Sequence, residues 1–258
     1  MTLSRRQKVI IILLVFYWPT LFILAHIPVP QLVRRADVSD KSLHFLAYLV
    51  LVFLLWFAMS SGKKVIWRKA AVWWVFFVLT VYGIVDELLQ GFVGRNCDVM
   101  DVIANLTGTL TGLLAFSVFT FWPAALLVTG AVIFGITNIA NANLAELMPV
   151  PNAMFHLFAY AIFTMLWIRY MHLFLSLKTA KLKWLIAALA APTVLLLTVK
   201  LCSVILGKYF TIPDMLVSVG AIAAVIAAIY LRKESQGLTA LFRSPKDALR
   251  RNQDIKAE

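Results

Sequence analysis

Long apolar runs follow one another along most of the chain and are separated by short polar segments. A run of about 18 or more residues with almost no charge is long enough to cross the hydrocarbon core of a membrane as a helix. The pattern predicts about eight such spans, over residues 9–26, 43–60, 70–91, 99–121, 123–143, 153–171, 184–206 and 213–231. We therefore expect an all-α polytopic membrane helix bundle. Pro28 and Pro30 would end the first span, and Trp122–Pro123 would mark the turn before the fifth.

Composition favours the same class of protein. The chain is 62% hydrophobic and 14% charged, whereas soluble domains are about a quarter charged. A soluble all-helical protein would need polar helices to cover its buried ones, and the sequence contains none before the C-terminal tail. The two cysteines, Cys97 and Cys202, form no metal-binding or redox motif.

The net charge of +12 comes from basic residues in short loops and at the termini. With a cytoplasmic N-terminus, eighteen of the 24 Lys and Arg residues fall on the cytoplasmic side. Five fall on the other side, namely Arg34, Arg35, Lys41, Arg95 and Lys208. This asymmetry follows the positive-inside rule, so we expect both termini in the cytoplasm and no nucleic-acid partner. The first span has the basic start of a signal peptide, but its apolar run is long, and we expect it to be retained.

The chain also contains two similar halves. Residues 27–30 are echoed by residues 148–151, and residues 44–48 are echoed by residues 156–160 at an offset of 112. At an offset of 113, Arg95, Asp98, Asp101 and Asn105 align with Lys208, Thr211, Asp214 and Ser218. Two tandem four-span units would have the same orientation, which is the parallel type of repeat. Chance similarity between apolar helices is the alternative. We expect units at 1–121 and 122–232, and a basic cytoplasmic tail at 233–258.

Ionisable and amide side chains gather at the non-cytoplasmic ends of spans two, three and four. Spacings of three and four residues place such side chains on one helical face. The groups are Lys41, His44 and Tyr48 in span two, Glu87 and Gln90 in span three, and Asp98, Asp101 and Asn105 in span four, with Arg95 in the loop between. Asp86 lies beside Glu87, and we expect its side chain on a different face. Ionisable groups within a bilayer usually face an interior cavity, so the groups predict a shared site.

The residue types suggest a pocket for an anionic group with carboxylates nearby. His44, Glu87 and Asp101 are candidate catalytic acids or bases, and the candidate binding residues are Lys41, Tyr48, Gln90, Arg95, Asp98 and Asn105. Structural roles are the alternatives: Asp98 and Asp101 suit a helix N-terminus, and Glu87 and Arg95 suit an ion pair. No zinc pattern, phosphate loop or Ser-His-Asp set is present, so we assign no metal ligand and leave the cofactor unknown. Gly108 and Gly112 predict close helix packing.

The first half resembles the VanZ-like family of bacterial membrane proteins, named for a teicoplanin-resistance protein. The matching residues are Asp40, Lys41, His44, Phe45 and Tyr48, then Glu87 and Gln90, then Arg95, Asp98, Asp101, Asn105 and Gly108. The resemblance implies a bacterial envelope protein, sometimes linked to glycopeptide tolerance, and no settled mechanism. The second half keeps His156, Tyr160 and Asp214, but Lys200 and Ser203 stand where Glu87 and Gln90 would align, so we expect a degenerate copy.

Three functions fit these residues. The first is a membrane enzyme acting at the outer leaflet on a lipid-linked or anionic envelope component. The second is a non-catalytic protein that binds or organises such a component. The third is a transporter or flippase, which the one-sided position of the polar groups makes less suitable. Membrane lipids are the expected partners in each case, and the sequence does not indicate an oligomeric state.

Overall fold

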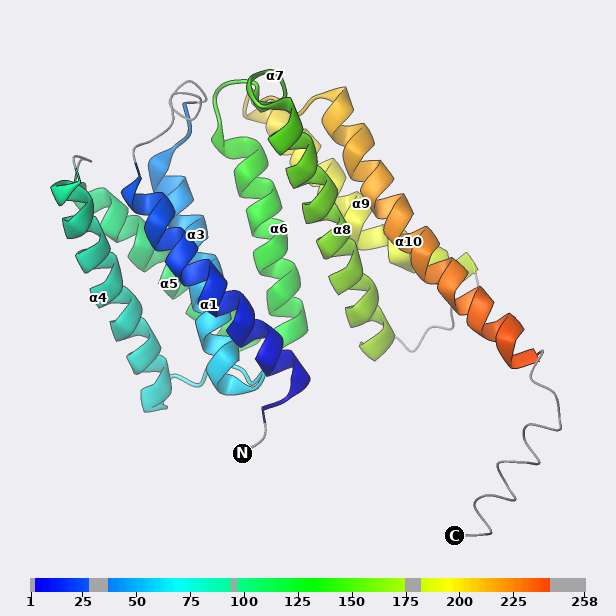
Figure 1. Ribbon diagram of the computed structural model, residues 1–258, viewed down its shortest axis with the longest axis horizontal. Helices are drawn as coiled ribbons and strands as arrows, with labels where there is room; N and C mark the ends of the chain where they lie inside the picture. The colour runs from blue at the N-terminus through cyan, green and yellow to red at the C-terminus, as the bar shows by residue number, and fades with distance from the viewer. Residues whose placement is uncertain (1–2, 28–36, 94–96, 175–181, 242–258) are drawn as a thin grey trace, which may run out of the picture.

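The computed structural model describes residues 3–27, 37–93, 97–174 and 182–241. Within these ranges the chain folds into helices that run roughly along one direction (Figure 1). The helices are α1 (Arg5–His26), α3 (Asp40–Ser60), α4 (Ala70–Phe92), α5 (Val99–Val118), α6 (Phe121–Ile139), α7 (Leu144–Leu147), α8 (Pro149–Phe174), α9 (Leu182–Ile205) and α10 (Ile212–Leu241). Among the described residues, eight of them are long and apolar enough to cross a membrane. The predicted all-α polytopic bundle is confirmed.

The helix boundaries differ from the predicted spans where polar residues or proline form the start of a helix. The turn between α5 and α6 lies at residues 119–120, so the prediction that Trp122–Pro123 forms it was wrong. Pro123 lies in the first turn of α6, where its missing N–H would have had no helical partner. The fifth span ends at Ile139 rather than 143, and the short α7 follows because the Asn143 side chain accepts a hydrogen bond from Ala145 N.

Helix α1 begins with a capping box, and one proline within it removes a backbone hydrogen bond. The Ser4 side chain accepts from Gln7 N, and the Gln7 side chain accepts from Ser4 N. Pro19 lies inside the helix and cannot donate a backbone hydrogen bond. The next residue, Thr20, donates from its hydroxyl to the carbonyl of Phe16. The helix ends at His26, and the predicted stop at Pro28 and Pro30 lies outside the described residues.

The first half of the chain is built around α3. This helix packs against α1, α5 and α6, and half of the residues in its apolar membrane-spanning stretch are buried. Its buried residues Leu51, Val52 and Phe57 belong to the same core cluster as Leu113 and Phe116 of α5. By contrast, few residues of α1 are buried, and its lipid-facing side carries exposed Ile12, Phe16 and Ile23. In a membrane that face contacts lipid.

Two glycines of α5 let it approach α3 closely, as predicted. A Cβ atom at Gly108 would clash with the backbone carbonyl oxygen of Phe45. One at Gly112 would clash with a methyl group of Val52. The absence of these two side chains brings the starts of α3 and α5 together. This approach positions the polar groups that both helices carry at that end.

In the second half, α8 takes the central place. It packs against α6, α9 and α10, just as α3 packs against α1, α4 and α5 (Figure 1). The parallel-repeat hypothesis expects this matching of helix pairs, and the two units themselves stay a prediction. Helix α6 also contacts α3 and joins the halves. The predicted tail boundary at 233 falls within α10, which continues to Leu241.

The two ends of the bundle carry different side chains. At the end where α1 begins, the Arg6 guanidinium donates to Ser61 O at 2.6 Å and lies over the Phe121 ring at 4.7 Å. At the opposite end, where α3 and α5 begin (Figure 1), Val38 pairs with Ala140. Asn141 there donates to the Asp37 carboxylate. The candidate site residues that the structure describes all belong to this second end, which we call the outer end because the charge distribution predicts that it faces away from the cytoplasm.

Candidate functional site

The outer end of α3, α4 and α5 brings together all of the candidate site residues that the structure describes. Arg95 lies outside the described residues. The others come from the start of α3, the last turns of α4 and the start of α5. We call this set, together with Asp40 and Asp86, the outer polar cluster; its members are Asp40, Lys41, His44, Tyr48, Asp86, Glu87, Gln90, Asp98, Asp101 and Asn105.

An exposed ion pair joins the first turn of α3 to the N-cap of α5. The Lys41 ammonium lies 2.7 Å from Asp98 Oδ2 and 3.7 Å from Asp101 Oδ1. The other oxygen of Asp98 accepts from Met100 N at 2.8 Å and caps α5, as the structural alternative for this residue expects. The hydrogen bond from Lys41 holds the pKa of the Asp98 carboxyl below its ordinary value. Asp98 is therefore ionised at neutral pH.

The imidazole of His44 lies between α3 and α5. Its Nδ1 atom is 3.0 Å from the amide oxygen of Asn105. Its Nε2 atom is 3.9 Å from both Asp40 Oδ1 and Asp101 Oδ2. Because an amide oxygen only accepts, the neutral ring carries its proton on Nδ1, and the Nε2 lone pair faces the two carboxylates.

Asp101 is the most enclosed carboxylate beside His44. Only 5% of its surface is exposed, and its Oδ1 atom has no hydrogen-bond partner among the described residues. The side chain points between the helices rather than capping α5, since Asp98 already occupies the N-cap. A buried carboxylate without a donor is costly, which singles out this position for chemistry or ligand binding.

Glu87 links the end of α4 to the start of α5. Its Oε1 atom accepts from Asp98 N at 2.8 Å. Its second oxygen is buried and has no hydrogen-bond partner in the part of the chain that the structure describes. One oxygen of Glu87 therefore makes a structural hydrogen bond, and the other is available to accept one. Any pairing with Arg95 falls outside the described residues.

A second polar group lies deeper, between α1 and α4, and the sequence pattern did not reveal most of it. Gln90 donates to Asp86 Oδ2 at 3.1 Å, and His26 Nδ1 lies 3.8 Å from Asp86 Oδ1. Asp86 is 3% exposed, so its predicted placement on a different face from Gln90 was wrong. A spacing of four residues, from 86 to 90, puts the two side chains on one face. His26 is distant from Asp86 in sequence, and only the fold brings the two together.

Tyr48 connects the two polar groups. Its ring stacks on that of Tyr82 with centroids 6.0 Å apart. A Cβ atom at Gly83 would lie 3.2 Å from the Tyr48 hydroxyl and 3.4 Å from Asn105 Nδ2. Both of these atoms are buried without a hydrogen-bond partner among the described residues. The glycine therefore leaves room for two donors at one point in the interior.

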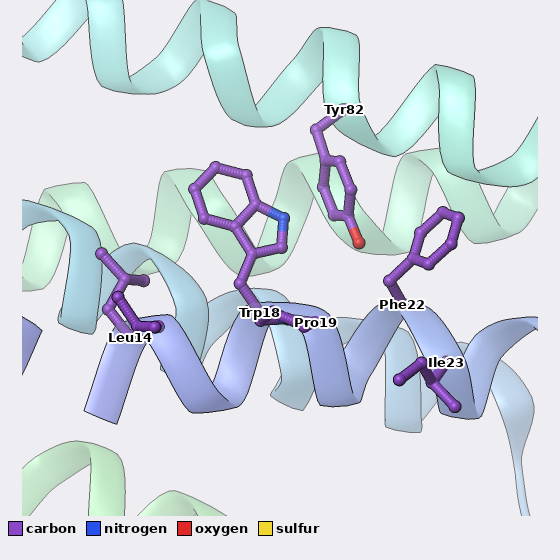
Figure 2. Close-up of a pocket in the computed structure, with 7 residues that line it drawn as sticks. Leu14, Trp18, Pro19, Phe22, Ile23 and Tyr82 are labelled. Atoms are coloured by element: carbon purple, nitrogen blue, oxygen red, sulfur yellow. The ribbon is translucent and has the colours of Figure 1, made fainter. Parts of the chain in front are cut away.

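A shallow apolar groove runs along α1 beside this cluster (Figure 2). Its volume is about 670 Å³, and it is lined by Leu14, Val15, Trp18, Pro19, Phe22, Ile23 and Tyr82. Figure 2 shows Tyr82 of α4 reaching toward the Trp18 and Phe22 side chains of α1. Phe22 stacks on His26 with centroids 4.1 Å apart. Through Phe22 the lining of the groove thus contacts His26, which lies beside Asp86.

The corresponding end of the second half holds a smaller polar set. Asn152 donates to Asp214 Oδ1 at 2.6 Å, and the other oxygen of Asp214 accepts from Thr211. His156 is buried against the Phe210 ring, with centroids 5.2 Å apart. Lys200 donates to the carbonyl of Phe210 at 2.5 Å. Lys200 thus ties α9 to the segment before α10, much as Glu87 ties α4 to the start of α5.

Fold and site together define a polytopic α-helical membrane protein with titratable side chains gathered at one end of its first four helices. Residues 3–120 match the family model described as VanZ/LLP1. The first half of the chain therefore matches the VanZ-like family, and the resemblance inferred from its motif is confirmed. No curated protein and no solved structure matches the chain.

Proposed function

We propose that the outer polar cluster binds the anionic headgroup of a lipid-linked cell-envelope component in the bacterial cytoplasmic membrane. The VanZ-like first half supports a multi-pass membrane protein. The excess of Lys and Arg in the loops at the other end supports cytoplasmic termini and an outward-facing cluster. Lys41, which is exposed at the outer end, provides a cation for an incoming anion.

The observation that carries this proposal is that the groove lies next to the cluster, with side chains of the groove lining in contact with polar residues. The groove opens on α1, whose apolar outer face contacts lipid in a membrane. Two residues that line it contact the polar groups: Phe22 stacks on His26, which lies 3.8 Å from Asp86, and Tyr82 stacks on Tyr48. A single amphiphile can place an acyl chain in the groove and its headgroup among the polar side chains. We therefore favour a lipid-linked component over a free anion.

Native mass spectrometry of the purified protein tests this proposal. Lipids that co-purify with the wild-type chain would be identified and quantified. Ile23→Trp fills the groove, whereas Leu24→Trp is its matched control, because Leu24 is equally exposed on α1 but does not line the groove. We expect Ile23→Trp and Lys41→Ala to lose the bound anionic lipid and Leu24→Trp to keep it. Equal retention by all four proteins would contradict the proposal.

Catalysis and binding are the two candidate uses of the cluster. The Nε2 lone pair of His44 beside a buried carboxylate is suited to proton transfer, which favours an enzyme. Asp101→Asn separates the two because it keeps the shape of the side chain and removes its charge and basicity. An enzyme would lose all turnover, whereas a binding protein would show a graded loss. Glycopeptide susceptibility of strains carrying each variant measures whether either activity affects tolerance.

A further inference from the structure

Three acceptor groups converge where α3 and α5 begin. His44 Nε2 is 3.9 Å from Asp40 Oδ1 and 3.9 Å from Asp101 Oδ2, which is too long for hydrogen bonds. One ligand atom from each of the three residues lies within 4.8 Å of the other two. A point equidistant from atoms spaced in this way is about 2–2.5 Å from each, which is the range of metal–ligand bonds in proteins.

The states of His44 and Asp101 favour a positive partner at that point. The contact with Asn105 places the His44 proton on Nδ1, so Nε2 presents a lone pair. Asp101 is more than nine-tenths buried, and no described residue donates a hydrogen bond to its Oδ1. Lys41 lies 3.7 Å away but gives its hydrogen bond to Asp98. A lone pair that faces a buried carboxylate is repelled unless a cation or a proton lies between them.

The charge balance of the cluster points the same way. Four carboxylates, those of Asp86, Glu87, Asp98 and Asp101, share one lysine and two imidazoles among the described residues that contact them, namely Lys41, His26 and His44. Each of these carboxylates would repel an anionic headgroup that approaches it. A divalent cation at the convergence point removes this obstacle and offers the headgroup a ligand.

We propose that Asp40, His44 and Asp101 bind one divalent cation. One imidazole nitrogen and two carboxylate oxygens form a donor set that suits Mn²⁺ or Zn²⁺. Three protein ligands leave coordination positions open for an oxygen of a bound anion. Asn105 is the partner that fixes the orientation of the His44 ring. The metal site stands on this geometry alone, and its link to a lipid headgroup rests on the proposed function.

The second half contains a related set of side chains, in which a hydrogen bond from an amide satisfies the aspartate and no cation is needed. Asn152 and Asp214 flank His156, which is 2% exposed, at the same end of the bundle. Asn152 donates directly to Asp214 at 2.6 Å, so an amide N–H satisfies this carboxylate. Thr211 satisfies its other oxygen. In the first half Asp40 stands at the residue that aligns with Asn152, and an ionised carboxylate cannot donate as that amide does.

Metal titration of the purified protein tests the proposal. Wild-type protein would be stripped with EDTA, freed of chelator and titrated with MnCl₂, followed by electron paramagnetic resonance of free Mn²⁺. A parallel titration with ZnCl₂ would be followed by calorimetry. We expect about one ion per chain. Asp40→Asn, His44→Ala and Asp101→Asn should each weaken binding of that ion at least about tenfold.

Glu146→Gln is the matched control. Glu146 is an exposed residue of α7 that accepts from Asn143 and is not a member of the cluster, so this variant should bind the ion as the wild type does. Asp40→Asn guards against misfolding, because Asp40 is exposed in the first turn of α3; gel filtration and circular dichroism would check each variant. Absence of a stoichiometric site for either ion, or wild-type affinity in all three variants, would overturn the proposal. Because the titration needs no lipid, the metal site can be refuted while lipid binding is confirmed. Lipid binding can likewise be refuted while the metal site is confirmed.

Discussion

The Nδ1 atom of His44 lies 3.0 Å from the Oδ1 atom of Asn105, and this contact joins α3 to α5 at the outer polar cluster. The contact selects one neutral tautomer, in which Nε2 carries the lone pair that faces Asp40 and Asp101. Neighbouring helices thus determine which His44 atom is available for a proton, a metal ion or a substrate. The roles proposed for the cluster depend on this arrangement.

Removal of the Asn105 acceptor should release the His44 ring. In Asn105→Ala we expect a mixture of the two neutral tautomers, whereas the wild type should show only the form protonated at Nδ1. Nitrogen-15 chemical shifts of labelled histidine, measured in lipid bilayers at neutral pH, distinguish these forms. Cation affinity should fall about 10–100-fold in the same variant, as is usual when the hydrogen-bond partner of a metal ligand is lost. A single unchanged tautomer in Asn105→Ala would refute this role.

The pair between Lys41 and Asp98 predicts a pH-dependent contribution to stability. The pKa of Asp98 is lower in the folded chain than in the unfolded chain, so the pair stabilises the fold above the unfolded pKa, which is about 4. The contribution is lost as pH falls through the folded value. Asp98→Asn keeps a good N-cap residue and removes only the charge. The difference in unfolding temperature between wild type and this variant should be small and constant near neutral pH and should vanish in acid. A difference that grows in acid would contradict the assignment.

The close approach of α3 and α5 predicts contrasting effects of two glycine substitutions. Gly108→Ala forces a methyl group against the backbone carbonyl of Phe45 and should cost about 1–3 kcal/mol. Gly220→Ala is the control, because a Cβ atom there meets nothing within 4 Å. It should be neutral or stabilise α10 by up to about 1 kcal/mol. Equilibrium unfolding in mixed micelles measures both. Equal effects of the two substitutions would show that α3 and α5 are further apart.

Glu87 is expected to have separable structural and functional roles. Its Oε1 accepts from Asp98 N, and a glutamine side chain can still accept that hydrogen bond. Glu87→Gln should therefore keep the stability of the wild type, while Glu87→Ala should lose about 1 kcal/mol because a partly buried N–H loses its partner. If the carboxylate charge also acts in the site, both variants should lose function. Full function in Glu87→Gln would leave Glu87 with the structural role alone.

Much of the fold follows from the sequence because membrane helices are specified by length and hydrophobicity. Local details were predicted less well. Trp122–Pro123 suggested a turn, but proline is equally suited to the first turn of a helix, and α6 uses Pro123 there. The short α7 depends on a single cap by Asn143. The alternative starting points of a helix differ little in free energy, so packing between helices determines which one is used.

The candidate site shows a similar division. Spacing along α3 predicted that Lys41 and His44 share one helical face, and the structure brings both side chains close to Asp101 of α5. The contact between His26 and Asp86 could not be predicted, because it joins α1 to α4 across 60 residues. In the sequence Asp40 is distinguished only as a member of the family motif, and its position beside the His44 Nε2 atom emerges from the fold.

The most direct test of the central claim is the profile of envelope lipids and cell-wall precursors in a strain that lacks this protein. We predict that one lipid-linked or anionic species changes in abundance. Wild-type protein should restore it, whereas Asp101→Asn and Glu87→Gln should fail although both insert in the membrane at wild-type levels. An unchanged profile in the deletion strain, or full restoration by both variants, would contradict the claim that the outer polar cluster acts on an envelope component.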